Sequence, residues 1–400
     1  MRFDIQKMIL TQCAVCATEL GLSLGKKCGR CSTRYCGADC QKQHWEEGGH
    51  DKLCKKIKKA GGAEQYNANQ KYSEAVTVAA EACAEDTKGQ TCYICTQALH
   101  WKTKEGLVRG CSCRGTAGFA HVSCLAEQAK ILCFEAEENN LGREAFVSRF
   151  ERWGTCGLCE QSYHGVVMHA LGWACWKTYV GRPDGDSGVM SRMSALRYLG
   201  IGLSAGGHHA DAVSVQEAEL STLRRIGSPE ECILVTQGNL AIAYERNGRP
   251  EDCLRTWQDI YSRCLEFFGE EHEQSILGAL NYASTLNDLE RFAEARSLFG
   301  KVIPVARRVL GDSHDITLRM RSNYARALYV DPGATLDHLR EAVTTLEETD
   351  LTARRVLGGA HPVTMGIESD LRNTRAALGA REESDVSGAM AAMAPPSAQH

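Results

Sequence analysis

The sequence predicts a mainly α-helical protein in which two small metal-binding modules precede an array of helical repeats. Three observations lead to this fold class. Sixteen of the 20 cysteines lie before residue 160, mostly in close pairs. The later part of the chain repeats an apolar helical pattern with a period of 42 residues. The chain has 400 residues, 43% of them hydrophobic, so it is long enough to bury more than one core.

The close cysteine pairs indicate metal thiolates in a reducing compartment, and a disulfide framework is the alternative. The first module offers eight ligands in four short spacings: Cys13-x2-Cys16, Cys28-x2-Cys31, Cys36-x3-Cys40 and His50-x3-Cys54. Eight sulfur and nitrogen ligands are enough for two tetrahedral zinc ions and leave no open position for water. Both sites are therefore expected to be structural.

This ordered series, with Tyr35 before the third pair and Trp45 shortly after it, resembles a MYND-type zinc finger. The resemblance implies a module that receives short peptide segments of partner proteins. It also implies two interleaved sites, with Cys13, Cys16, Cys36 and Cys40 on one ion and Cys28, Cys31, His50 and Cys54 on the other. His44 is the alternative to His50, because it follows Cys40 at the same spacing at which Cys54 follows His50.

A second set of eight ligands has the order four cysteines, one histidine, three cysteines: Cys92-x2-Cys95, Cys111-x-Cys113, His121-x2-Cys124 and Cys156-x2-Cys159. This order resembles a RING-CH (RING-variant) finger, the type found in one group of ubiquitin ligases. The resemblance implies a cross-brace, with Cys92, Cys95, His121 and Cys124 on one ion and Cys111, Cys113, Cys156 and Cys159 on the other. The two modules together are expected to hold about four zinc ions.

A RING-type ligase positions a charged ubiquitin-conjugating enzyme, so its activity depends on surface contacts. Ile94 matches the apolar position at which RING-like fingers contact that enzyme. Other features depart from the family: the last cysteine pair encloses no proline, acidic Glu160 follows Cys159 where many active members carry a basic residue, and no tryptophan follows Cys124 closely. Whether the protein is an enzyme is therefore left open, with ubiquitin ligase activity as the possibility.

The helical repeats contain matching residues 42 positions apart. The triplet that starts at Asn281 recurs at Asn323, and Gly269-x2-His272 recurs at Gly311-x2-His314 and again at Gly358-x2-His361. Each repeat is expected to form two amphipathic helices with small residues where the helices approach closely. The pattern resembles tetratricopeptide repeats of the kinesin-light-chain type. That resemblance implies a solenoid whose concave face binds extended peptides.

Residues at the turns have simpler expected roles. The repeated histidines are expected to form capping or turn hydrogen bonds rather than a ladder of metal sites. Gly248 and Asn287 are expected between the two helices of their repeats. Trp153, just before Cys156, is expected in the core, with an exposed partner contact as the alternative.

The predicted domains are a MYND-like finger (13–54), a helical linker (55–90), a RING-CH-like finger (91–160), a helical bridge (161–190), a repeat solenoid (191–380) and a disordered tail (381–400). If four zinc ions bind fourteen thiolates, the formal net charge moves from −4 to about −10. This charge makes nucleic acid an unexpected partner. No apolar segment is long enough to suggest a membrane span, so a cytoplasmic or nuclear location is expected.

These predictions support two functions. The first is a zinc-dependent interaction or adaptor protein, in which the repeats select a protein or peptide client and the fingers hold further partners. The second is a soluble ubiquitin ligase that uses the repeats as its substrate receptor and contacts a ubiquitin-conjugating enzyme at Ile94.

Overall fold

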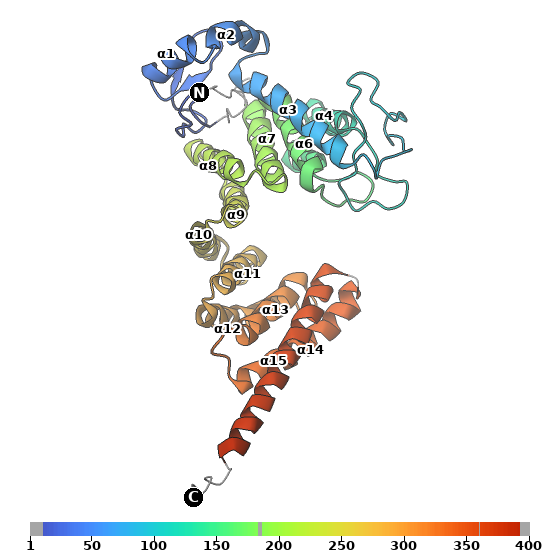
Figure 1. Cartoon of the computed structure of the whole chain (residues 1–400), viewed down its shortest axis with the longest axis vertical. Coiled ribbons are helices and arrows are strands. Elements are labelled where there is room, and N and C mark those ends of the chain that lie inside the picture. Colours follow the sequence, from blue (N-terminus) through green and yellow to red (C-terminus); the bar gives the residue numbers. More distant parts are fainter. Residues whose placement is uncertain (1–10, 183–185, 360, 393–400) are drawn as a thin grey trace, which may run out of the picture. The chain divides into compact units, whose positions relative to one another are not determined.

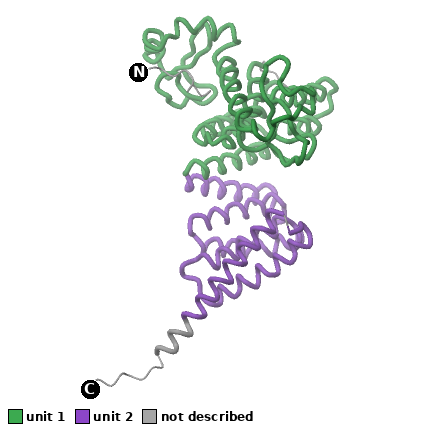
Figure 2. The backbone as a smooth tube through the Cα atoms, turned by 45° about the vertical axis from the view of Figure 1, so that its right-hand side comes forward, with its two compact units in different colours: residues 1–248 green, residues 249–400 purple. Residues whose placement is uncertain are grey.

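The computed structural model describes residues 11–182, 186–359 and 361–392. Helices form most of the chain (Figure 1). The chain divides into two compact units, residues 1–248 and residues 249–400 (Figure 2). Each unit is described separately below.

The first metal module folds around a two-stranded antiparallel sheet and two short helices. Its elements are β1 (Lys26–Lys27), β2 (Arg34–Tyr35), α1 (Ala38–Glu46) and α2 (His50–Lys59). Gly49 separates the two helices with a φ of 69°, a left-handed conformation that glycine adopts without a steric penalty. Tyr35 and Ile57 are fully buried in the small core of this module.

The second metal module consists mainly of segments without helix, residues 90–121 and 154–164. The helices of this region are α3 (Ala63–Ala82), α4 (Val122–Glu138), α5 (Gly142–Phe150) and the short 3-10 helix η2 (Glu151–Trp153). Isolated bridges join Val108 to Ala120 and Thr155 to Ser162. Trp153 is fully buried beside Phe150, so the expectation of a core tryptophan is confirmed.

Helix α6 (Gly165–Tyr179) is the centre of the core of unit 1. Ten of its 15 residues are buried, because apolar side chains occur on every side of the helix. A helix that is apolar all round must be covered on all sides, and α3, α4 and α7 (Asp186–Ala205) contact it. The segment expected to be a bridge between domains is therefore a core element.

Glycines allow α6 and α7 to cross at very short range. A Cβ atom added to Gly172 would lie 2.8 Å from the carbonyl oxygen of Tyr198 and 3.2 Å from the Cα atom of Gly202. Only glycine leaves room for such an approach of two backbones. The crossing holds α7 against α6, which itself contacts α3 and α4.

Two further helices, α8 (His209–Arg225) and α9 (Glu230–Arg246), complete unit 1. The sequence places the start of the repeat domain near residue 191, whereas the structure groups α7, α8 and α9 with the metal modules and begins the second unit at Arg249. The apolar surface of α6 explains this difference, because α7 covers it.

Unit 2 is built from helices that pack in succession. They are α10 (Pro250–Phe268), α11 (Glu273–Asp288), α12 (Phe292–Val309), α13 (Asp315–Tyr329), α14 (Leu336–Leu357) and α15 (Pro362–Ala392). Ala283 and Ala325, which are 42 residues apart, are both fully buried where neighbouring helices meet. Phe299 of α12 is also fully buried.

Two details of the repeats differ from the sequence prediction. Asn287 lies inside α11 near its end, buried, and its Nδ2 atom donates a hydrogen bond to the carbonyl oxygen of Asn323 at 2.9 Å. The turn residue is instead Glu290, whose φ of 59° matches the φ of 71° at Gly248, 42 residues earlier. Asparagine commonly marks a turn, but here its amide joins two repeats.

The tail also differs from expectation. Residues 381–392 are helical because α15 continues through Ala392, while residues 393–400 lie outside the described part of the chain. The segment is rich in alanine, a strong helix former, and it extends a helix that is already nucleated, which favours elongation. None of the described helices is long and apolar enough to cross a membrane.

Candidate metal centres

The first of four Cys/His clusters contains Cys13, Cys16, Cys36 and Cys40. Cys36 lies just before α1 and Cys40 in its first turn, and their Sγ atoms are 3.4 Å apart. The Sγ atom of Cys16 lies 3.5 Å from that of Cys36 and 3.7 Å from that of Cys40. Side chains from a loop, from the segment before α1 and from the first turn of α1 thus meet around one point.

The second cluster contains Cys28, Cys31, His50 and Cys54, all of them buried. The Nε2 atom of His50 lies 3.4 Å from the Sγ atom of Cys31, and the Sγ atoms of Cys28 and Cys54 are 3.9 Å apart. His50 and Cys54 belong to the first turns of α2, so helix periodicity places both side chains on one face.

His44 lies outside this cluster, although it is equally buried. Its Nδ1 atom is 3.0 Å from the hydroxyl oxygen of Tyr35. Burial, with a smaller effect of His50, lowers the pKa of His44 to about 4, so its imidazole is neutral near pH 7. Burial also lowers the pKa of His50, which favours the neutral imidazole that ligates a metal ion.

The third and fourth clusters lie in the second module and have the cross-braced order. One contains Cys92, Cys95, His121 and Cys124, and the other contains Cys111, Cys113, Cys156 and Cys159. The Nδ1 atom of His121 is 3.4 Å from the Sγ atom of Cys95 and 3.6 Å from that of Cys124. In the fourth cluster the Sγ atoms of Cys113 and Cys156 are 3.8 Å apart.

Polar contacts around the second module favour the ligating forms of its side chains. The Nε2 atom of His121 lies 3.4 Å from the carbonyl oxygen of Ala98. A proton on Nε2 leaves the lone pair of Nδ1 facing the sulfurs. Burial opposes ionisation of Cys156, but the backbone N–H groups of Cys159 and Leu158 outweigh it and lower its pKa to about 7.

The geometry of all four clusters fits zinc. In each cluster the four candidate ligand atoms lie within 4.8 Å of one another. Four atoms bound at about 2.3 Å in a tetrahedron are separated by about 3.8 Å, close to the separations given above. Each cluster supplies four sulfur or nitrogen atoms, so a bound ion has no open position. Such sites stabilise the fold and do not activate water.

Apolar side chains are exposed in both modules. Trp45 on α1 is 47% exposed, and its ring centroid lies 5.7 Å from that of His50. Ile94 and Leu158, each inside a Cys-x2-Cys loop of the second module, are 37% and 51% exposed. The sequence prediction included Ile94 but not Trp45 or Leu158 as surface contacts. The sequence holds no signal for Trp45 as a surface residue, because Trp153 also lies close to a cysteine and is fully buried.

The repeated histidines of unit 2 cap helices and hold no cluster. His272, His314 and His361 each accept a hydrogen bond through Nδ1 from the backbone N–H group two residues later, at 3.2, 3.4 and 3.3 Å. The expected capping role is therefore confirmed. It satisfies one of the backbone N–H groups that have no partner within the helix.

The first helices of successive pairs contact one another. Helix α11 contacts α13, and α13 contacts α15, in addition to the contacts between consecutive helices. These helices therefore line the inner side of the array. Asn281 and Asn323 are partly exposed at equivalent positions of α11 and α13. Asn281 thus presents a side-chain amide that can both donate and accept hydrogen bonds, while the Nδ2 atom of Asn323 donates one hydrogen bond to the carbonyl oxygen of Arg319 at 3.0 Å.

Comparisons with known protein families support the first metal module and the helical repeats. The sequence profile of the MYND finger matches residues 13–54, and the profile of the tetratricopeptide repeat matches residues 274–348. No curated protein matches the chain.

Two solved structures show a partial likeness to the chain. Nearly identical TPR-like repeats of a kinesin light chain from Podosopora anserina have 21% sequence identity and a TM-score of 0.41, over 48% of this chain and 90% of that chain. BtubC (BKLC) from P. vanneervenii has 13% identity and a TM-score of 0.40, over 70% of this chain and 96% of that chain. The two sequence profiles and the ligand clusters show that the chain contains a zinc-binding MYND finger at residues 13–54 and tetratricopeptide repeats that include residues 274–348.

Proposed function

We propose that the protein is a zinc-dependent adaptor, in which the repeats bind an extended segment of a client protein and the two metal modules hold further partners. In this proposal the sixteen residues of the four clusters ligate four structural zinc ions. The MYND finger and the tetratricopeptide repeats support the protein-interaction role, because both module types act through surface contacts.

The observation that carries the proposal is the polar inner side of the repeats. Asn281, Ser284 and Asp288 follow one stripe of α11, at helix spacings of three and four residues. Arg319, Asn323 and Arg326 follow the same stripe of α13. An extended peptide has unpaired N–H and C=O groups along its backbone, and side-chain amides such as that of Asn281 can pair with both.

A peptide library displayed against the full, zinc-loaded chain tests this proposal. Selected peptides should bind the wild type, and the double variant Asn281→Ala/Asn323→Ala should weaken that binding about tenfold or more, because two hydrogen bonds of about 1 kcal/mol each are lost. Ser297→Ala is the matched control, since Ser297 is exposed on α12, a second helix of its pair. Binding that the double variant leaves unchanged would contradict the proposal.

The MYND finger is proposed to contact its partner through Trp45. A large aromatic side chain that is half exposed beside a rigid metal cluster is a typical anchor for a partner. A second group of selected peptides should lose binding with Trp45→Ala while the zinc content stays unchanged. Leu24→Ala is the control, because Leu24 is 66% exposed in the same module. Equal effects of both variants would argue against a specific site at Trp45.

A second candidate function is that of a ubiquitin ligase. Ile94 and Leu158 are both exposed, and both loops that carry them lie near Gln128 of α4. The hydroxyl group of Tyr93 donates a hydrogen bond to the Oε1 atom of Gln128 at 3.4 Å, and a Cβ atom on Gly157 would lie 3.9 Å from the same oxygen. These contacts support an apolar contact surface of the kind that a ubiquitin-conjugating enzyme needs.

An autoubiquitination assay with a panel of conjugating enzymes separates the two candidates. A ligase should form ubiquitin chains with the wild type and lose them with Ile94→Ala, while Leu99→Ala, which changes another exposed apolar residue of the module, should retain them. No transfer from folded, zinc-loaded protein across the panel would leave the adaptor as the function.

A further inference from the structure

A groove lies in unit 1 between α3 and residues 98–107 of the second metal module. It consists of two clefts of about 470 and 360 Å³, which share Ala80 of α3 and Gly106 of the module. A Cβ atom on Gly106 would lie 3.5 Å from the Cβ atom of Ala80, so the two walls are in contact where the clefts meet. The groove shares no residue with the four metal clusters.

The two clefts differ in polarity. The larger cleft contains six amide, hydroxyl or charged side chains that recur along its walls: Asn69, Ser73, Glu81, Lys104, Glu105 and Lys177. The apolar side chains of the smaller cleft are Ala80, Ala84, Ala98, Leu99 and Leu107. The groove is therefore suited to a chain that carries a charged residue near one end and an apolar residue near the other.

Lys177 of α6 offers an unpaired cation to the polar end of the groove. Its Nζ atom lies 4.1 Å from the centroid of the Tyr72 ring, at a distance typical of a cation–π interaction. The ammonium group forms no hydrogen bond or ion pair with a described residue, and it is not among the buried polar atoms. Burial lowers the pKa of Lys177, and Glu105 opposes this effect. An ammonium group that has lost part of its hydration gains from an anionic partner.

The two carboxylates of the larger cleft leave this cation available. The Oε1 atom of Glu105 accepts a hydrogen bond from the backbone N–H group of Ser123 at 2.7 Å. Its Oε2 atom accepts hydrogen bonds from the hydroxyl groups of Ser123 at 2.7 Å and Thr103 at 3.0 Å. Glu81 lies about three helical turns beyond Asn69 on α3. Neither carboxylate forms an ion pair with Lys177.

Asn69 provides a second donor beside Lys177. Its Oδ1 atom accepts a hydrogen bond from Nε2 of Gln65 at 3.3 Å, and the same Nε2 atom donates to the carbonyl oxygen of Lys177 at 3.0 Å. The Nδ2 atom of Asn69 has no partner among the described residues and is not buried. An amide N–H group and an ammonium group are both donors, so this end of the groove favours an acceptor that carries negative charge.

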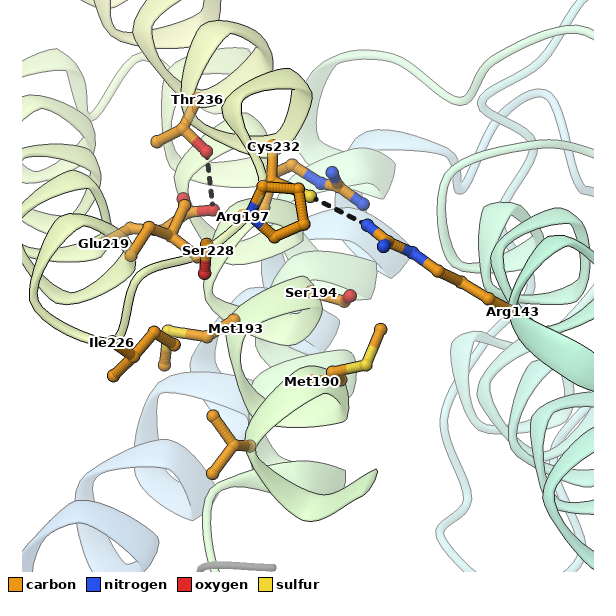
Figure 3. A pocket seen from close by; sticks show the side chains of 13 residues that line it. Arg143, Met190, Met193, Ser194, Arg197, Glu219, Ile226, Ser228, Cys232 and Thr236 are labelled. Carbon is orange, nitrogen blue, oxygen red and sulfur yellow. Dashed lines mark hydrogen bonds between the residues drawn. The ribbon is translucent and has the colours of Figure 1, made fainter. Parts of the chain in front are cut away.

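The cavity beside Glu219 offers no such donor. It has a volume of about 130 Å³ and lies between α7, α8 and α9 (Figure 3). The Oε1 atom of Glu219 accepts a hydrogen bond from the hydroxyl group of Thr236 at 3.1 Å, and its Oε2 atom is shielded from solvent. At the rim, Arg143 donates a hydrogen bond to the Sγ atom of Cys232 at 3.2 Å. These polar groups are paired or out of reach, in contrast to Lys177.

We propose that the groove beside α3 binds an extended segment of a partner protein that places an acidic side chain at Lys177 and an apolar side chain beside Leu107. The carboxylate accepts hydrogen bonds from Nζ of Lys177 and Nδ2 of Asn69. The inference rests on the proposed adaptor function in that the partner is a protein, but it uses neither Trp45 nor the inner side of the repeats.

The length of the groove sets the spacing of the two anchor residues. Asn69 and Ala80 are eleven residues apart on α3, which corresponds to about 16 Å along the helix axis. An extended chain rises about 3.3 Å per residue. The acidic and the apolar residue of the partner are therefore about five positions apart.

A library of seven-residue peptides with blocked ends, screened against the full, zinc-loaded chain, provides the probes. The binders should include a group with an acidic residue about five positions from an apolar residue. Fluorescence anisotropy should show that Lys177→Met weakens the binding of this group about tenfold or more, because a charged hydrogen bond is lost. Lys102→Met, which changes an exposed lysine outside the groove, should leave it unchanged. The proposal is overturned if no binder depends on Lys177.

A change in the peptide tests the same contact without relying on the fold of a variant. Glutamine in place of the acidic residue should weaken binding to the wild type about tenfold or more. The same change should have little further effect on Lys177→Met, since the two substitutions remove one interaction. Equal losses with both proteins would overturn the pairing with Lys177.

A pair of tryptophan variants tests the apolar end. Ala84 and Ala82 are both exposed, but only Ala84 lines the groove. Ala84→Trp should abolish the binding of the Lys177-dependent peptides, and Ala82→Trp should retain it. Equal effects would overturn the placement in the groove. Asn281→Ala/Asn323→Ala and Trp45→Ala should leave these peptides bound, so a failure of the repeats or of the MYND finger as receptors is measured separately.

Discussion

The Nε2 atom of His50 lies 3.4 Å from the Sγ atom of Cys31, within a cluster of three cysteines and one histidine. His44, six residues earlier, is equally buried but has its Nδ1 atom 3.0 Å from the hydroxyl group of Tyr35. The two histidines have equivalent spacings to a cysteine in the sequence. Their surroundings separate them, because only His50 starts the helix that also carries Cys54.

The two histidines should therefore respond differently to substitution. His50→Ala should remove one zinc ion per chain, because a tetrahedral structural site loses one of its four ligands. His44→Ala should keep the zinc content and lower the free energy of unfolding by about 1–3 kcal/mol, because the buried hydroxyl group of Tyr35 loses its partner. Metal analysis by mass spectrometry and thermal unfolding measure both effects. Loss of zinc from His44→Ala alone would reverse the assignment.

The capping histidines of unit 2 should contribute a measurable part of its stability. His314→Ala should lower the free energy of unfolding by about 0.5–2 kcal/mol, because the N–H group of Ile316 at the start of α13 loses its acceptor. His314→Asn should restore most of it, since asparagine is a strong N-cap residue. Urea unfolding followed by circular dichroism gives the comparison. Equal stabilities of the alanine and asparagine variants would contradict a capping role.

The crossing of α6 and α7 should tolerate no side chain at Gly172. Gly172→Ala should destabilise unit 1 by about 1–3 kcal/mol, because the added methyl group would lie 2.8 Å from the carbonyl oxygen of Tyr198. Gly300→Ala is the control within a helix: its added methyl group meets no atom within 4 Å, and it should stabilise α12 by about 0.5–1 kcal/mol. Thermal unfolding of both variants tests the pair. If Gly172→Ala leaves the free energy of unfolding unchanged, α6 and α7 are not in close contact at this position.

The raised pKa of Glu219 should make the stability of unit 1 depend on pH. In the folded state the carboxyl group of Glu219 has a pKa of about 7, whereas in the unfolded state its pKa is near 4.5. The stabilisation by this proton is complete below pH 4.5 and is lost as the pH rises through 7. Between pH 6 and pH 8 the wild type should lose about 1 kcal/mol more than Glu219→Gln, which has no such proton. Parallel stability curves of the two proteins in urea would contradict the shift.

Much of the fold could be predicted because its signals are local. Cysteine spacings fix which residues can share an ion, and a 42-residue period fixes which helix positions are equivalent. The boundary of unit 1 could not be predicted, because it depends on how α7 covers the apolar surface of α6. That cover requires the backbone approach at Gly172, which has no signature in a single sequence. The cavity beside Glu219 depends on three helices and was missed for the same reason.

Features of the surface were harder to predict than features of the core. Nothing in the sequence distinguishes the buried Trp153 from the half-exposed Trp45, since both lie close to cysteines. The packing of Trp153 against Phe150 and Tyr179 decides its burial. The choice between His44 and His50 likewise depended on Tyr35, whose hydroxyl group is directed to one of them.

The central claim is that two closed zinc modules support the interaction surfaces, and the zinc content of the purified full chain tests it most directly. Mass spectrometry should find about four zinc ions per chain. Each cluster is tested by one ligand variant, and every variant should lower the zinc content: Cys16→Ser, Cys31→Ser, Cys95→Ser and Cys159→Ser. A content near two ions per chain, unchanged by Cys95→Ser and Cys159→Ser, would show that the second module is not a zinc module.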